Sequence, residues 1–133
     1  MDNDKAWYVF RYYSHLMNEQ ERAANRHLAG TIKATHGRSD AGAQTEARSG
    51  PRHLREMLSD EAQVLDLASG GFQAFVLRAG ERIMRDHQEK IALNCCPQCG
   101  RLARTPTARQ CGFCRHDWHN RITNSKETFP SPE

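Results

Sequence analysis

All five cysteines of this chain of 133 residues fall within the twenty-residue stretch "CCPQCGRLARTPTARQCGFC". Two pairs, Cys96 with Cys99 and Cys111 with Cys114, have two residues between their members and eleven residues between the pairs. Four thiolates with this spacing can surround one tetrahedral metal ion. An odd number of cysteines so close together is poor material for a disulfide framework. We therefore predict that four cysteines bind one metal ion: Cys96, Cys99, Cys111 and Cys114.

The residues around the first pair suit a tight turn. In "CPQCG", the proline fixes its own φ, and Gly100 can take a positive φ after Cys99. Such a turn directs backbone N–H groups at the sulfurs, which stabilises their thiolate form. We call residues 96–100 the first cysteine turn and residues 111–115 the second cysteine turn.

With these two turns, the stretch resembles a zinc ribbon of the rubredoxin-like type over about a fifth of the chain. The resemblance implies a β-hairpin with "RLART" and "ARQC" as strands and Pro106 near the turn. It implies bound Zn²⁺ or, as in rubredoxins, iron. Residues 94–121 are basic and have only Phe113 and Trp118 as aromatic residues, so we expect zinc. Four thiolates leave no coordination position for substrate, so the predicted role of the zinc is structural.

Four residues near the predicted ligands leave details of the site open. Arg115 stands where glycine is frequent, so we expect a strained or differently shaped second turn. The spacing favours Cys96 over Cys95 as ligand and leaves Cys95 as a strand residue, an oxidation-sensitive thiol or an occasional substitute. His116 and His119 could replace a cysteine or form a second site, although four thiolates already complete a structural shell.

The excess positive charge of the chain lies in the same stretch. Residues 1–93 carry thirteen basic and thirteen acidic side chains, whereas residues 94–121 have a net charge of +4. All basic residues of that stretch are arginines, which suit bidentate contact with phosphate or carboxylate. We predict that four of them meet nucleic acid or another acidic partner: Arg101, Arg104, Arg109 and Arg115. A solvated basic surface that binds nothing is the alternative.

The residues before the cysteines show the apolar periodicity of helices. One stripe predicts a helix over residues 5–17. Asn18 with Glu21 has the spacing of a cap for a second helix, which we expect to stop at Gly37. Another stripe predicts a last helix over about residues 72–90.

Between these helices the pattern is weaker. Residues 37–50, "GRSDAGAQTEARSG", are small and polar, and we expect a loop there rather than a helix over residues 40–48. Pro51 suits the first turn of a short helix, and Asp60 with Gln63 predicts another cap.

Four residues of the first predicted helix lie off its apolar stripe: Trp7, Tyr8, Arg11 and Tyr12. Aromatic and arginine side chains are enriched in protein interfaces. A protein-interaction or assembly role, with a purely structural zinc, is therefore the competing functional hypothesis. Coverage of these side chains by other helices is the alternative.

No familiar catalytic signature occurs in the chain. There is no G-x-S-x-G, glycine-rich phosphate loop or His-Glu-x-x-His, and no histidine follows a glutamate by three residues. Transcript-cleavage factors contain a similar zinc ribbon, in which an acidic pair at the hairpin tip positions a metal ion in RNA polymerase. The tip of the hairpin expected here, residues 105–107, has no acidic residue. We expect a protein that is not an enzyme.

Composition completes the predicted architecture. No apolar run reaches the roughly 20 residues of a membrane helix, and the N-terminus lacks a signal-like pattern, so we expect a soluble, cytoplasmic protein. The predicted fold is mainly α, with a helical region at 1–92, a zinc ribbon at 93–121 and a disordered tail at 122–133. The leading functional prediction is a non-enzymatic zinc-ribbon protein whose arginines contact nucleic acid or a nucleoprotein machine.

Overall fold

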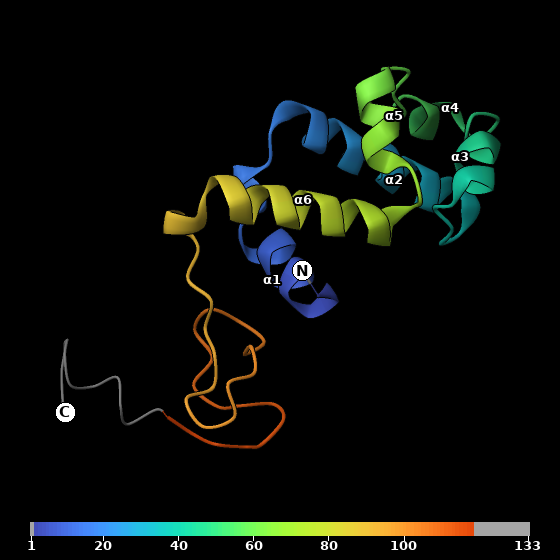
Figure 1. Cartoon of the computed structure of the whole chain (residues 1–133). Helices are drawn as coiled ribbons and strands as arrows, with labels where there is room; N and C mark the ends of the chain where they lie inside the picture. The colour runs from blue at the N-terminus through green and yellow to red at the C-terminus, as the bar shows by residue number, and fades with distance from the viewer. Residues whose placement is uncertain (1, 119–133) are drawn as a thin grey trace. The chain divides into compact units, whose positions relative to one another are not determined.

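The computed structural model describes residues 2–118, and the chain divides after Gln88 into two compact units. Unit 1, up to this boundary, contains the six α-helices of the described residues, and unit 2, after it, contains the cysteines. Figure 1 shows the helices of unit 1 with their labels. The predicted mainly helical fold is confirmed for the described residues. The expected tail at 122–133 and His119 lie outside them.

Helices α1 (Asn3–Tyr12) and α6 (Phe72–Asp86) pack against each other through aromatic rings (Figure 1). Phe10 on α1 meets Phe72 and Phe75 on α6, with ring centroids 5.7 and 5.9 Å apart. Both contacts are edge to face, the arrangement that the charge distribution of aromatic rings favours. The apolar stripes predicted from the sequence therefore meet in one core.

The close approach of α1 to α6 depends on a glycine. A Cβ added to Gly80 would lie 3.1 Å from the Cα of Ala6, so a larger residue there would push the helices apart. Both helices end earlier than predicted, and each is followed by a single 3-10 turn, at Ser14–Leu16 and Gln88–Lys90 respectively.

Helix α2 (Glu19–Thr35) begins with the predicted cap. The Asn18 side chain accepts a hydrogen bond from the N–H of Glu21 at 2.8 Å, and the Glu21 carboxylate accepts one from the N–H of Asn18 at 3.0 Å. At the other end, His36 and Gly37 have φ values of 58° and 110°. These left-handed residues end the helix where the sequence predicted.

Helix α3 (Ala41–Ala47) replaces the loop that we predicted. Asp40 caps it by accepting a hydrogen bond from the N–H of Ala43 at 2.7 Å. Ala43 and Ala47 are buried, and α3 packs against α2. Because its buried face consists of alanine, the segment shows no large apolar residues at helical spacing, which is why the loop prediction was wrong.

Helices α4 (Arg52–Arg55) and α5 (Ala62–Ala68) complete unit 1. The prediction that Asp60 caps α5 is wrong. Glu61 is the N-cap residue and makes no side-chain capping hydrogen bond. The carboxylate of Asp60 instead accepts a hydrogen bond from Arg48 at 2.8 Å. Asp60 therefore forms an ion pair with a distant residue and does not cap the helix.

A buried ion pair ties α6 to the start of α2. Glu21 is 2% exposed, and Arg82 donates hydrogen bonds to both of its carboxylate oxygens, from Nε at 2.8 Å and from a terminal nitrogen. The same guanidinium donates to the carbonyl oxygen of Leu16 at 3.0 Å. Glu21 thus serves the α2 cap and the ion pair together, and removal of its charge leaves Arg82 without a buried counter-charge.

We expect Glu21→Gln to lower the free energy of unfolding of unit 1 by about 3 kcal/mol, because breaking a buried pair leaves one charge uncompensated. Urea unfolding followed by far-ultraviolet circular dichroism measures this change. Glu19→Gln, an exposed substitution in the same first helical turn, should change it by less than about 0.5 kcal/mol. Equal losses in the two variants would contradict the assigned role of the pair.

His27 joins α2, α3 and the segment before α5 through a buried hydrogen-bond network. Its Nδ1 accepts a hydrogen bond from the N–H of Ser59 at 3.0 Å, so its Nε2 carries the proton and donates to Gln44 Oε1 at 3.1 Å. Burial lowers the pKa of His27 below 6.5; the Gln44 hydrogen bond opposes this shift, nearby Arg48 adds to it, and Asp60 opposes it. The folded protein therefore holds this imidazole neutral.

Unit 1 should lose stability as the pH falls below about 6.5, because unfolded His27 takes up a proton that folded His27 resists. Between pH 6.5 and 5.5, we expect the free energy of unfolding of the wild type to fall by up to about 1 kcal/mol more than that of His27→Gln. Urea unfolding at a series of pH values tests this difference. Exposed His53, replaced by Gln, is the control, and an unchanged pH slope in His27→Gln would refute the prediction.

Candidate metal centre

The structure brings the four predicted ligand cysteines together. The Sγ atoms of Cys96 and Cys114 are 3.6 Å apart, and those of Cys99 and Cys111 are 3.5 Å apart. All four sulfurs lie within 4.8 Å of one another. Sulfurs bound to a tetrahedral Zn²⁺ at about 2.3 Å are about 3.8 Å apart. This four-cysteine cluster (Cys96, Cys99, Cys111 and Cys114) can therefore hold one metal ion.

Both cysteine turns direct backbone N–H groups at the sulfur of their first cysteine. The donors to Cys96 lie two and three positions later, each at 3.4 Å, and those to Cys111 have the same offsets, at 3.3 and 3.4 Å. One position after the second cysteine, Gly100 and Arg115 have φ values of 79° and 68°. Arg115 therefore adopts the left-handed conformation that Gly100 takes in the first cysteine turn, which costs a residue with a Cβ about 1 kcal/mol.

The predicted β-hairpin differs from the pairing in the structure. Among residues 2–118 no β-strand is formed, and antiparallel pairing is limited to two isolated bridges: Cys95 with Leu102 and Gln110 with Asp117. Each bridge joins the two sides of one cysteine turn, whereas we predicted pairing between residues 101–105 and 108–111. A tight turn brings its own flanks together at a low loop-closure cost, so each cysteine turn closes on itself.

The apolar core of unit 2 is small. Its buried residues are Cys96, Ala103, Cys111 and Trp118, with Ala108 packed against them. Two of these four are also members of the four-cysteine cluster. So little apolar burial gives a domain marginal stability by itself, and a metal ion bound by the cluster would add its binding free energy to folding.

The other candidate ligands lie outside the cluster. Cys95 is exposed and takes part in the backbone bridge to Leu102. The ring of His116 stacks on Trp118, with centroids 6.1 Å apart. Of the cysteine, histidine and acidic residues in the described part of unit 2, only the four cysteines form a metal-ligand group. His119 lies outside the described residues.

Three of the thiols, those of Cys96, Cys111 and Cys114, differ in acidity. The pKa of Cys111 falls to about 6, chiefly because the N–H of Cys114 donates to its sulfur. Burial raises the pKa of Cys96, but the N–H donors of the first turn and the neighbouring thiols of Cys114 and Cys99 together lower it. A backbone hydrogen bond from His116 lowers the pKa of Cys114, but burial and three neighbouring thiols raise it to about 12. A bound cation would favour ionisation of all four.

Two of the predicted arginines lie against the second cysteine turn. The guanidinium carbon of Arg101 is 4.7 Å from the ring centroid of Phe113, in a cation–π contact. The Nε of Arg104 is 3.2 Å from the position that a Cβ on Gly112 would take, so its side chain lies over the backbone of that turn. Phe113 was not among the predicted site residues, although its position between two predicted ligand cysteines in "CGFC" was the available signal.

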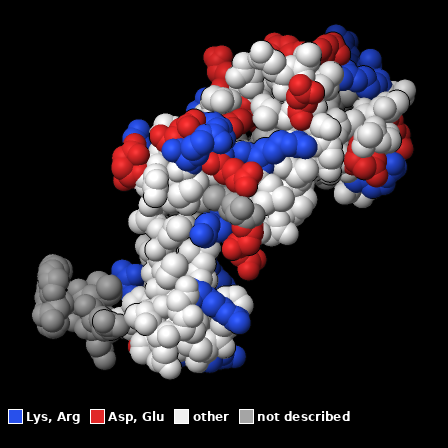
Figure 2. All heavy atoms as spheres, viewed as in Figure 1, with Lys and Arg blue, Asp and Glu red and all other residues white. Residues whose placement is uncertain are grey.

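The other two arginines have different surroundings. Arg109 is half-buried, and its guanidinium donates to the carbonyl oxygens of Thr107 and Ala108 at 3.2 and 3.3 Å. Arg115 is exposed. Within residues 2–118, none of the four predicted arginines forms a salt bridge with a carboxylate. Figure 2 shows basic side chains spread over a mostly uncharged surface on the visible face of unit 2.

The residues of the alternative partner surface on α1 are only partly available. Trp7 is half-buried and donates a hydrogen bond from Nε1 to Gln73 Oε1 on α6 at 3.2 Å. Tyr8, which we expected to be accessible, is 4% exposed. Tyr12 is half-buried with its ring 5.6 Å from that of Tyr8, and Arg11 is exposed. The aromatic side chains therefore serve packing more than the sequence suggested.

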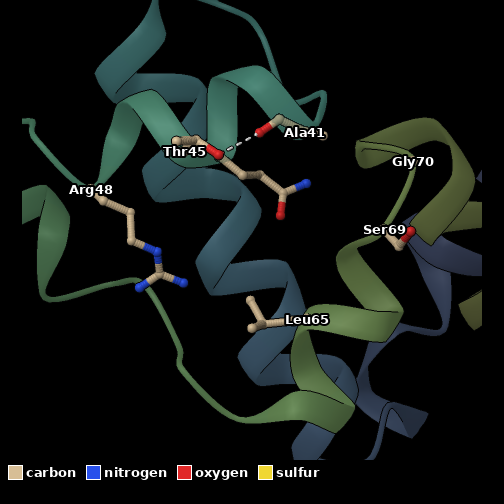
Figure 3. Close-up of a pocket in the computed structure, with 7 residues that line it drawn as sticks. Ala41, Thr45, Arg48, Leu65, Ser69 and Gly70 are labelled. Atoms are coloured by element: carbon tan, nitrogen blue, oxygen red, sulfur yellow. Dashed lines mark hydrogen bonds between the residues drawn. The ribbon is translucent and has the colours of Figure 1, made fainter.

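A hollow with a volume of about 280 Å³ lies between α3 and α5 in unit 1 (Figure 3). The residues that line it are Ala41, Gln44, Thr45, Arg48, Leu65, Ser69 and Gly70. The Thr45 hydroxyl donates to the carbonyl oxygen of Ala41 at 3.1 Å, and Arg48 donates to Asp60 and to the carbonyl oxygen of Ser59. Because these polar groups already have partners, this hollow is a weaker candidate site than the four-cysteine cluster.

Comparison of the chain with protein-family models, with curated proteins and with solved structures gave no match. None of the helices in residues 2–118 combines the length and the apolar character needed to cross a membrane.

We expect purified protein to contain one metal ion per chain and Cys96→Ser to lose it, because three remaining thiolates cannot complete the shell. Elemental analysis after gel filtration measures the ratio of metal to protein. Cys95→Ser, at the adjacent exposed position, is the matched control and should retain the ion. If Cys95→Ser lost the ion and Cys96→Ser retained it, Cys95 and not Cys96 would be the ligand, and the prediction would be wrong.

Proposed function

We propose that unit 2 is a zinc ribbon in which the four-cysteine cluster binds one structural Zn²⁺. An all-sulfur ligand set suits zinc and iron and disfavours hard cations such as Mg²⁺ and Ca²⁺. The basic surroundings and the few aromatic residues favour zinc over the iron that rubredoxins bind. Four sulfurs complete a tetrahedral shell and leave no position for water or substrate, so the proposed role of the ion is to fix the fold of unit 2.

We further propose that this zinc ribbon contacts nucleic acid or a nucleoprotein machine through its arginines. The observation that carries this proposal is that Arg101, Arg104, Arg109 and Arg115 all belong to the small cysteine-containing unit and form no salt bridge with a described carboxylate. Guanidinium groups without carboxylate partners can make bidentate hydrogen bonds to phosphates.

In this proposal the protein is not an enzyme. The predicted metal shell is closed, and the hollow in unit 1 assembles no nucleophile with an adjacent base. An assembly role for α1 has weaker support, because Trp7 and Tyr8 are engaged in packing.

The affinity of the full chain for nucleic acid should fall steeply as salt increases, because phosphate contacts release counterions. We expect Arg104→Ala/Arg109→Ala to weaken binding and reduce the slope of log K against log salt concentration by about 2, without loss of zinc. Fluorescence anisotropy with labelled DNA and RNA from low to high salt measures both quantities.

Arg26→Ala/Lys33→Ala removes two exposed charges from α2 and is the matched control for net charge. This variant should bind like the wild type. An equal loss in both double variants would indicate that net charge acts without a specific surface. Unchanged binding in Arg104→Ala/Arg109→Ala would contradict the proposed interface.

A further inference from the structure

Phe113 is unusual among the large apolar residues of the described chain. It is 55% exposed, whereas all the others are buried or half-buried. A single exposed phenylalanine needs no explanation by itself. This one, however, lies between two members of the four-cysteine cluster, and its N–H donates to Cys111 Sγ at 3.3 Å. The second cysteine turn therefore fixes the backbone that presents the ring.

The surroundings of the ring add a cation and a hollow. Arg101 lies over one ring face, with its guanidinium carbon 4.7 Å from the ring centroid. Cys99, Arg101, Phe113 and Cys114 line an open hollow of about 340 Å³. This volume is within the range of pockets that hold small organic groups, which begins at about 300 Å³. A flat group can enter here and meet an aromatic ring and a guanidinium plane.

The charge around the ring indicates what kind of group that is. Arg101 and Arg104 lie against the second cysteine turn, and Arg115 belongs to it. Each cation can contact a backbone phosphate, while the ring offers a π-face to a base. Bases expose their faces only where they are unpaired and unstacked, so this combination fits a single strand better than a duplex.

We propose that Phe113, with Arg101, is a stacking platform for an unpaired base of a single-stranded nucleic acid. This inference rests on the proposed nucleic-acid contact and specifies its partner. Phenylalanine has no hydrogen-bonding group, so the platform accepts any base and contributes affinity rather than sequence preference. The neighbouring arginines hold the phosphates on either side.

The test uses the full chain loaded with zinc and fluorescence anisotropy. The probes are oligouridine and oligothymidine strands of about 12 nucleotides, a duplex of the same length and a strand of the same length without bases. We expect the unpaired strands to bind most tightly and Phe113→Ala to lower their affinity about tenfold. The salt slope and the zinc content should stay unchanged in Phe113→Ala, since the ring carries no charge. Phe113→Trp should restore affinity, and Gln98→Ala, exposed in the first cysteine turn, is the control.

The outcomes separate this inference from the function on which it rests. Binding that depends on the arginines but is unchanged in Phe113→Ala, or is equal for the strand without bases, overturns the stacking platform alone. Tighter binding of the duplex does the same. Failure of the wild type to bind any nucleic acid at low salt overturns both proposals, and Phe113-dependent binding of polyglutamate in its place assigns the surface to an acidic protein.

Discussion

The organisation of unit 2 depends on four sulfurs held within 4.8 Å of one another. Without a cation, and against the hydrogen bond from the backbone of His116, burial and the three neighbouring thiols raise the pKa of Cys114 to about 12. A divalent cation bound among these sulfurs would attract thiolates from both cysteine turns and so join the two turns. The alternative source of stability, apolar burial, is limited to a four-residue core that includes two of the ligands. In the proposed site, metal binding and the folding of this unit are therefore coupled.

Unit 1 achieves its stability by ordinary means. Aromatic rings and a close glycine contact join α1 to α6, and the Glu21–Arg82 pair connects α6 to the cap of α2. His27 connects α2 to α3 and to the segment before α5 through neutral hydrogen bonds. None of these interactions uses a sulfur. The helical unit thus has a core of its own, and the surface proposed to bind nucleic acid belongs to the unit that contains the four-cysteine cluster.

The sequence predicted the features that depend on local spacing. The cap at Asn18 follows from two residues three positions apart, and the cysteine cluster from two cysteine pairs whose members are three positions apart; both occur in the structure. Predictions that depended on distant contacts were weaker. Helix α3 has an alanine face that only packing against α2 reveals, and Asp60 bonds to Arg48 instead of capping α5. The hairpin prediction paired the segments between the cysteine turns, whereas each turn closes on its own flanks. Phe113 is a candidate binding residue because of its exposure and its contact with Arg101, and both are seen only in the structure.

In the proposed site, four thiolates surround one structural zinc, which fixes the surface on which Arg101, Arg104 and Phe113 lie. X-ray absorption at the zinc edge of the purified full chain tests this claim most directly. We expect four sulfur scatterers at about 2.3 Å and no lighter atom in the first coordination shell. A shell that contains nitrogen or oxygen scatterers at about 2.0–2.1 Å would contradict this claim, because histidine or water would then occupy a position proposed for cysteine.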